Sequence, residues 1–244
     1  MTPLATPLAL QLPGAPSLVF LAYVLLFLPW AALRSRRRLA TLRAEGGAGR
    51  PLTRAAVWMS TIVSLVILLV LAVLVGRGFG YDFFALPALD VQVLGATVGA
   101  FAACLLLRQV LRALRSEDER RRAVVYLIAP RTPRERVLWA LACVLAGVAE
   151  ETAYRGVGMA TLWYALGDAW ASALILSAAF AVAHAAQGWK SGLAVFGIAL
   201  VMHALVQFTG SLLPAMLVHA VFDLVAGAII ARDARKLDAE AAAG

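Results

Sequence analysis

Charged side chains are scarce in this sequence. Only 15% of its 244 residues are Asp, Glu, Lys or Arg, whereas 62% are hydrophobic, and the mean hydropathy is +0.84. Soluble domains usually contain about 45–50% apolar residues. The composition therefore excludes an ordinary soluble domain and predicts an integral membrane protein.

Acidic residues are even fewer than basic ones, 14 against 22, which leaves a net charge of +8. Basic excess is also typical of nucleic-acid-binding proteins, but here Lys and Arg cluster between apolar segments, where membrane proteins carry their cytoplasmic loops. We therefore expect contacts with anionic membrane lipids and no nucleic-acid partner.

Cysteine is almost absent. Cys104 and Cys143 lie in apolar runs and lack the spacing of metal ligands, so we expect buried thiols that serve packing. The zinc-protease pattern His-Glu-x-x-His is missing as well. Residues 1–16 lack the basic start of a signal peptide, which predicts that residues 17–33 are retained as a membrane span.

Apolar segments of spanning or near-spanning length recur along the chain. About 20 residues cross the hydrocarbon core as a helix, and an open sheet cannot satisfy its backbone groups in lipid. The sequence therefore predicts an all-α, polytopic membrane helix bundle of about seven spans, forming one integral membrane domain. The expected spans are 17–33, with Pro29 as a site for a kink, 55–76, 90–111, 136–154, 169–186, 191–208 and 211–231.

The basic residues predict the orientation. They fall in the regions 34–54 and 108–136, at Lys190, and at 232–236. All four regions share one side if the N-terminus is outside and the C-terminus is cytoplasmic, as the positive-inside rule requires. Within the second region, residues 116–129 mix charged and apolar side chains, which is typical of an interfacial helix.

Two adjacent carboxylates, Glu150 and Glu151, close the fourth apolar segment. Glu151 and Arg155 are four residues apart on one helix face, so they can form an ion pair. Glu150 points about 100° away and has no local cation. An ionisable residue inside a membrane is a functional-site hypothesis by default, and an unpaired carboxylate there suits a general base.

The start and end of this segment are also marked. Thr132 to Glu135 reads as a capping box that begins a helix, and Gly156 with Gly158 favours a break after the carboxylates.

The three histidines of the chain all lie in apolar segments. His184 ends the fifth, and His219 shares a helix face with Asp223 on the seventh. Burying Glu150, His184, His219 and Asp223 together creates one polar cavity, the usual setting for chemistry inside a membrane. His203, in the sixth segment, has no acidic neighbour on its face, and we expect it to form an interhelical hydrogen bond.

These residues resemble the CPBP family of intramembrane proteases, the CAAX proteases and bacteriocin-processing enzymes that are also called the Abi family. The resemblance covers roughly residues 130–232, which it identifies as the catalytic core. Residues 1–129 supply N-terminal spans and basic loops, and residues 233–244 a cytoplasmic tail. The matching motifs are Glu150-Glu151-x-x-x-Arg155-Gly156, Phe180-x-x-x-His184 and His219-x-x-x-Asp223. Asp223 stands where eukaryotic members carry Asn, which changes the charge of the site by one.

The resemblance implies an endopeptidase that cleaves a membrane-associated peptide or lipidated protein. Glu150 would activate the water, while His184, His219 and Asp223 would position it or stabilise the oxyanion. Glu151, Arg155 and Phe180 would support these groups. Two mechanisms stay open: a metal-free glutamate mechanism, favoured by family analogy, or a Zn²⁺ held by His184, His219 and Glu150.

Two other classes of function remain. Glu150, His184 and Asp223 are also suited to a proton relay in a transporter, although the inverted repeats that would favour one are not evident. A non-catalytic immunity or scaffold protein is the third possibility. The Ala-, Arg- and Leu-rich composition points to a bacterial inner membrane.

Overall fold

The structure is a computed structural model that describes residues 14–44, 53–78, 82, 84–116, 119 and 124–243. Within these ranges it contains helices and no strand, which confirms the predicted all-α class. Most of the N-terminal segment 1–16, and parts of the basic regions 34–54 and 108–136, lie outside the described residues.

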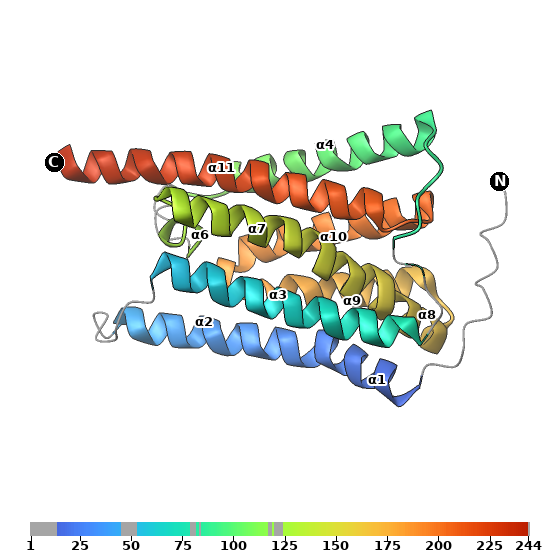
Figure 1. The fold of residues 1–244 in the computed structure, drawn as a ribbon. Helices are drawn as coiled ribbons and strands as arrows, with labels where there is room; N and C mark the ends of the chain where they lie inside the picture. Colours follow the sequence, from blue (N-terminus) through green and yellow to red (C-terminus); the bar gives the residue numbers. More distant parts are fainter. Residues whose placement is uncertain are drawn as a thin grey trace.

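The helices lie lengthwise beside one another in a bundle (Figure 1). In chain order they are α1 (Ala15–Ala22), α2 (Leu28–Ala44), α3 (Arg54–Arg77), α4 (Val91–Ala113), α6 (Val124–Leu127), α7 (Pro133–Glu150), α8 (Met159–Leu166), α9 (Ala169–Ala183), α10 (Trp189–Thr209) and α11 (Leu213–Ala243), with π-helical segments at Tyr23–Phe27 and Glu151–Gly158 and a 3₁₀ turn at Ala185–Gln187.

Six helical stretches in the described residues are long and apolar enough to cross a membrane, and α9 is a shorter apolar helix between two of them. At 1.5 Å per residue, its 15 residues span about 22 Å. Together with the exposed Leu and Val side chains along the other helices, this indicates a multi-pass integral membrane protein. The structure thus has six helices of spanning length in the described residues where the sequence predicts about seven spans, and the predicted fifth span corresponds to the shorter helix α9.

Parts of all four basic regions meet at one end of the bundle. This is the end at which α11 finishes in Figure 1. The contacts that join them are Arg54 to the Leu127 carbonyl (2.9 Å), Arg112 to Asp233 (2.9 Å), Arg131 to Asp238 (2.7 Å) and Lys190 to Glu119 (2.7 Å). The shared side that the sequence predicts is therefore present in the fold, and its cytoplasmic orientation stays a prediction.

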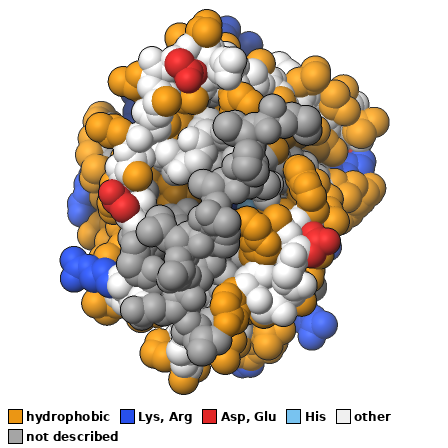
Figure 2. All heavy atoms as spheres, turned by 90° about the vertical axis from the view of Figure 1, so that its right-hand side faces the viewer, with side chains coloured by type: hydrophobic (Ala, Val, Ile, Leu, Met, Phe, Trp, Pro, Cys, Tyr) orange, Lys and Arg blue, Asp and Glu red, His pale blue; other side chains and the backbone are white. Residues whose placement is uncertain are grey.

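Among the described residues, few charges lie at the opposite end. Figure 2 shows this face with many hydrophobic side chains, acidic side chains scattered singly over it, and Lys and Arg side chains at its rim. Asp90 and Asp168 lie at this end as N-caps, where their carboxylates accept hydrogen bonds from the backbone N–H groups of Val93 and Ala171. This asymmetry between the ends is the pattern that orients membrane proteins.

The helix that carries the two carboxylates is longer than the sequence predicts. The capping box at Thr132 and Glu135 is formed, and from there the chain is helical without interruption to Leu166. The predicted break at Gly156 and Gly158 is wrong. The chain instead widens into a π-helix, and a Cβ at Gly158 would lie 2.9 Å from the carbonyl oxygen of Ala153. Glycine there permits close packing rather than a turn.

Three smaller differences follow from local chemistry. π-Helical hydrogen bonding occurs at Tyr23–Phe27, in the turn before Pro29, which cannot donate a backbone hydrogen bond to that turn, and the kink at Pro29 stays a prediction. The tail predicted at 233–244 continues α11 as far as Ala243. Of the predicted interfacial helix at 116–129, the described helical residues are Glu119 and the four residues of α6.

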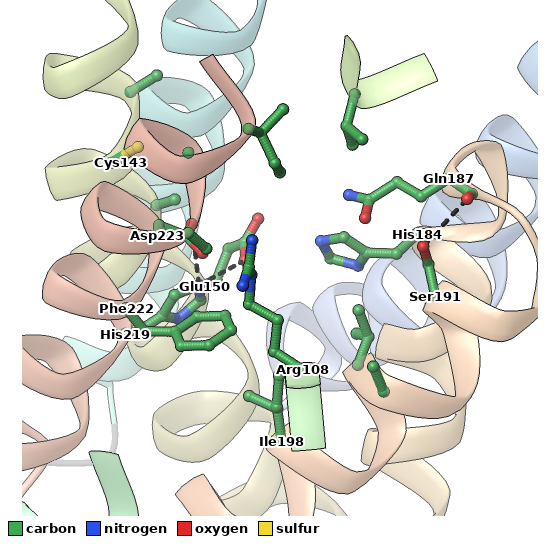
Figure 3. Close-up of a pocket in the computed structure, with 18 of the residues that line it drawn as sticks. Arg108, Cys143, Glu150, His184, Gln187, Ser191, Ile198, His219, Phe222 and Asp223 are labelled. Carbon is green, nitrogen blue, oxygen red and sulfur yellow. Dashed lines mark hydrogen bonds and ion pairs between the residues drawn. The ribbon is translucent and has the colours of Figure 1, made fainter. Parts of the chain in front are cut away.

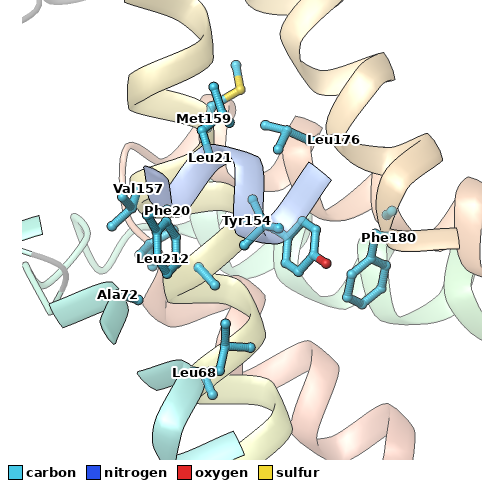
Figure 4. Packing of buried hydrophobic residues seen from close by; sticks show 14 of the residues in the cluster. Phe20, Leu21, Leu68, Ala72, Tyr154, Val157, Met159, Leu176, Phe180 and Leu212 are labelled. Carbon is cyan, nitrogen blue, oxygen red and sulfur yellow. The ribbon is translucent and has the colours of Figure 1, made fainter. Parts of the chain in front are cut away.

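Buried apolar side chains surround the π-helical segment. Tyr154 and Val157 point from it into a cluster with Phe20 of α1, Leu68 of α3 and Leu176 of α9 (Figure 4). Each of these side chains is less than one-tenth exposed. The core therefore fixes the helix that bears the carboxylates against α1, α3 and α9.

The contact between α7 and α11 yields a stability prediction. A Cβ at Gly147 would lie 2.8 Å from the Met216 carbonyl oxygen and 3.0 Å from the Ala220 backbone nitrogen. Since backbone cannot move aside easily, Gly147→Ala is expected to lower the free energy of unfolding by about 1–3 kcal/mol. Gly99→Ala in α4 is the matched control, because no atom lies within 4 Å of its added Cβ. Unfolding of both variants in detergent micelles gives the comparison, and equal stabilities would contradict the close approach.

Candidate active site

Glu151 is fully buried and holds two partners. Its Oε1 accepts a hydrogen bond from Arg155 Nη1 at 3.2 Å, and both side chains are at most 1% exposed. Arg155 also donates to the Ala199 carbonyl of α10 at 3.2 Å and stacks over the Phe180 ring at 4.8 Å. The ion pair predicted from the i, i+4 spacing is formed, and it connects the carboxylate helix to α9 and α10.

His219 is the second partner of Glu151. The distance between its Nδ1 and Glu151 Oε1 is 2.7 Å. A carboxylate that pairs with an arginine can only accept, so Nδ1 carries the proton and donates it to Glu151. This contact fixes the orientation of the ring. Its Nε2 then faces Glu150 Oε2 at 3.7 Å and Asp223 Oδ2 at 3.6 Å.

Phe180 separates and aligns the two histidines. Its ring lies 4.5 Å from the His184 ring and 6.4 Å from the His219 ring, measured between centroids, and it meets the Tyr154 ring edge-on at 4.8 Å. His184 Nδ1 donates to the Phe180 carbonyl at 2.8 Å, which leaves Nε2 directed away from the backbone of its own helix. The second motif therefore supplies both a spacer and an oriented imidazole.

A cavity of about 450 Å³ brings the predicted residues together. Glu150, His219 and Asp223 line one wall, from α7 and α11, and His184 lies across from them (Figure 3). Glu151, Arg155 and Phe180 also reach its surface. The cavity extends to Arg112, Arg115 and Tyr126 and so opens toward the basic end of the bundle. Such a site combines an apolar lining with a few convergent polar groups, as small binding sites usually do.

For four residues, the position in the structure differs from the sequence prediction or adds to it. His203 lies outside the cavity, and the expected interhelical hydrogen bond is not formed with any of the described residues. Cys143 is buried as predicted but also lines the cavity. Gln187 and Arg108 face the cavity. The sequence prediction does not single out Gln187, and it groups Arg108 with the basic loop residues. The i, i+4, i+7 spacing of the arginines at 108, 112 and 115 was the signal that would have placed them on one helix face.

The described residues contain no group of three His, Cys, Asp or Glu side chains arranged to hold a metal ion. His219 keeps its Nε2 free because only its Nδ1 contacts Glu151, but His184 lies across the cavity from Glu150 and His219 (Figure 3). The donor set His184, His219 and Glu150 therefore does not fit a metal in this arrangement. The zinc-dependent mechanism stays a prediction, and a measurement of bound zinc would test it.

These features define a class of protein: a multi-pass helical membrane protein whose buried carboxylate and imidazole groups line one cavity. Comparison with protein families adds that residues 132–225 match the model of the type II CAAX prenyl endopeptidases, Rce1-like. The match confirms the family resemblance of this segment. Comparisons with curated proteins and with solved structures find no match.

The buried ion pair gives the second stability prediction. Arg155→Met leaves Glu151 charged, buried and without its cation, so it should destabilise the fold by about 3–5 kcal/mol. Lys190→Met is the control, because it breaks the partly exposed pair with Glu119 and should cost at most about 1 kcal/mol. Denaturation of both variants in the same detergent measures the difference. Similar losses would show that burial of the Glu151 pair carries no special cost.

Proposed function

We propose that this protein is an intramembrane endopeptidase that hydrolyses a peptide bond of a membrane-associated substrate. One observation supports the proposal most directly: Glu150 reaches a cavity inside the bundle, on the wall opposite His184, while its neighbour Glu151 is saturated by other partners. A free carboxylate and a free imidazole nitrogen facing one another are suited to general acid–base catalysis.

In the proposed reaction, Glu150 takes a proton from a water molecule as the oxygen of that water forms a bond to the scissile carbonyl carbon. The negative charge that develops on the carbonyl oxygen needs a donor close by. His184 Nε2 and His219 Nε2 are the candidates when each ring carries a second proton, because the Nδ1 atom of each already donates to another group. The C–N bond then breaks, and Glu150 returns the proton to the leaving amine. The products are a carboxylic acid and an amine, and one water is consumed.

Glu151 acts through His219 in this scheme. By accepting the Nδ1 proton at 2.7 Å, it keeps the imidazole oriented with Nε2 toward Glu150 and Asp223. When Nε2 is also protonated, it can donate to the oxyanion, with Asp223 balancing the charge. Glu151 and Arg155 are therefore positioning residues. Phe180 serves the same purpose by packing between the rings.

The proposed substrate is a peptide or a lipidated protein that reaches the cavity from the membrane. The name of the matching family includes prenyl substrates, and a prenyl chain would lie in the lipid beside the helices. We place the basic end in the cytoplasm by the positive-inside rule and propose a bacterial inner membrane. The cavity opens toward this end, so that soluble products would leave into the cytoplasm.

The third prediction tests the catalytic assignment. Glu150→Gln and His184→Ala should each lower cleavage by about 10²–10⁴-fold, the usual contribution of a general acid–base group, while the folded protein is retained. Glu119→Gln, a change at the partly exposed Lys190 pair, should cleave like the wild type. The assay uses purified protein in detergent and a fluorogenic peptide library that includes prenylated members. Cleavage by Glu150→Gln at the wild-type rate would remove Glu150 from the mechanism.

The fourth prediction concerns the metal. Under the glutamate mechanism, wild-type protein should cleave with no bound zinc and should be insensitive to chelators. Bound zinc is determined by mass spectrometry on the same preparations. Stoichiometric zinc together with chelator-sensitive cleavage would instead favour a metalloprotease. Absence of cleavage, combined with pH-dependent uptake in proteoliposomes, would favour a proton-coupled transporter.

A further inference from the structure

Gln187 is a neutral polar residue on the wall of the cavity that bears His184. It follows His184 by three residues, at the end of the 3₁₀ turn Ala185–Gln187 between α9 and α10. In Figure 3 its side chain extends into the cavity beside the His184 ring, with the amide group at its tip. The family match covers this segment but assigns no role to single residues.

Hydrogen bonds fix the backbone of Gln187 and leave its side chain free. Its N–H donates to the His184 carbonyl at 3.0 Å, and its carbonyl accepts from the Ser191 hydroxyl at 3.0 Å. The next residue, Gly188, has φ +95°, which glycine adopts without strain, and the chain turns there into α10. The amide of Gln187 forms no hydrogen bond with any residue that the structure describes. The amide is therefore held at the cavity without a partner.

The two histidines of the site present acceptors to the cavity as long as their rings are neutral. A neutral imidazole carries one N–H group. His184 uses it at Nδ1, toward the Phe180 carbonyl, and His219 uses it at Nδ1, toward Glu151. Both Nε2 atoms then carry lone pairs. A carbonyl oxygen that becomes negative in the transition state needs the opposite, an N–H or O–H that points toward it.

A second proton on either ring has competing demands on it. On His219 it lies at Nε2, which faces Glu150 Oε2 at 3.7 Å and Asp223 Oδ2 at 3.6 Å, and ionised carboxylates are strong acceptors. His184 makes no ion pair with the described residues, so a charge on its ring would be unpaired in an apolar cavity. A side-chain amide avoids both problems, because its N–H groups need no added proton and carry no net charge.

Several other donors on the cavity walls are engaged or lie far from Glu150. The Trp58 indole donates to a backbone carbonyl. Trp139 precedes Glu150 by eleven residues on α7, which is about 16 Å at 1.5 Å per residue. The Arg108 guanidinium reaches the cavity, but the carboxylate of Asp233 acts on it. Gln187 differs from these because its donor is both unengaged and next to His184.

We propose that Gln187 donates a hydrogen bond to the carbonyl oxygen of the scissile peptide bond and stabilises its negative charge in the transition state. The proposal rests on the endopeptidase function proposed above. Gln187 transfers no proton: Glu150 takes the proton of the attacking water, the electron pair of the C=O bond moves to the oxygen, and it returns when the C–N bond breaks. The terminal torsion of a glutamine is soft, so the negative oxygen selects the N–H₂ side of the amide.

The test changes the amide and keeps the length of the side chain. Gln187→Met removes both N–H donors, and Gln187→Glu replaces them with an acceptor. Each should lower kcat by about 10²–10³-fold, the usual effect of losing one oxyanion donor. KM should stay close to the wild-type value, because an interaction made mainly in the transition state contributes little to substrate binding. The assay uses detergent-purified protein and a fluorogenic peptide that carries an S-prenyl cysteine followed by apolar residues.

Gln109→Met is the matched control, since it makes the same substitution at an exposed position of α4 that does not line the cavity. It should cleave like the wild type. Equal kcat values for Gln187→Met and the wild type would overturn the proposal alone and leave the protease function standing, and so would a loss confined to KM. A wild type that cleaves none of the peptides would remove the protease function and the proposal with it.

A binding experiment separates the oxyanion contact from a structural role of Gln187. A phosphinate analogue of the peptide carries a negative tetrahedral oxygen in place of the scissile carbonyl, and competition by fluorescence anisotropy measures its affinity. The analogue should bind the wild type about 10²–10³-fold more tightly than Gln187→Met. The parent peptide should bind Glu150→Gln protein and Glu150→Gln, Gln187→Met protein equally. Equal affinity of the analogue for wild type and Gln187→Met would overturn the proposal, as would a matching loss of affinity for the parent peptide.

Discussion

The buried carboxylate of Glu151 is the constraint on which the site depends. An uncompensated charge at this depth would cost several kcal/mol, so its two donors, Arg155 and His219, have to remain in place. Arg155 extends the connection to the Ala199 carbonyl on α10 and to the Phe180 ring on α9. Four separate helical segments thus converge on one charged group, and their relative positions are fixed by its need for partners.

The two adjacent glutamates consequently have different roles. Glu151 faces the packed interior, where its Oε1 has both donors, whereas Glu150 faces the cavity. The helix changes from α to π hydrogen bonding between them, at Glu151. Such π-helical segments are rare and occur often at functional sites. Apolar packing of Tyr154 and Val157 stabilises the segment (Figure 4), which allows a polar motif to lie in the middle of a membrane bundle.

The basic end and the cavity are parts of one arrangement. Three arginines, two in α4 and one just after it, change in environment along the cavity: Arg115 and Arg112 connect to α10 and α11 at the bundle end, and Arg108 faces the cavity itself. A substrate that enters from this end meets a positive surface before it reaches Glu150. The basic residues from which the sequence predicts the membrane orientation therefore also line the approach to the cavity.

The sequence by itself determined the helical class, the shared side of the basic regions and the Glu151–Arg155 pair, because hydropathy, charge placement and i, i+4 spacing are local properties. It also pointed to Glu150, His184, His219 and Asp223 as one group, since burying them separately is costly. The tertiary structure decided the rest. The donation of His219 to Glu151, the continuation of the helix past Gly156, and the position of Arg108 in the cavity all depend on which helices lie side by side, and local sequence patterns do not specify that.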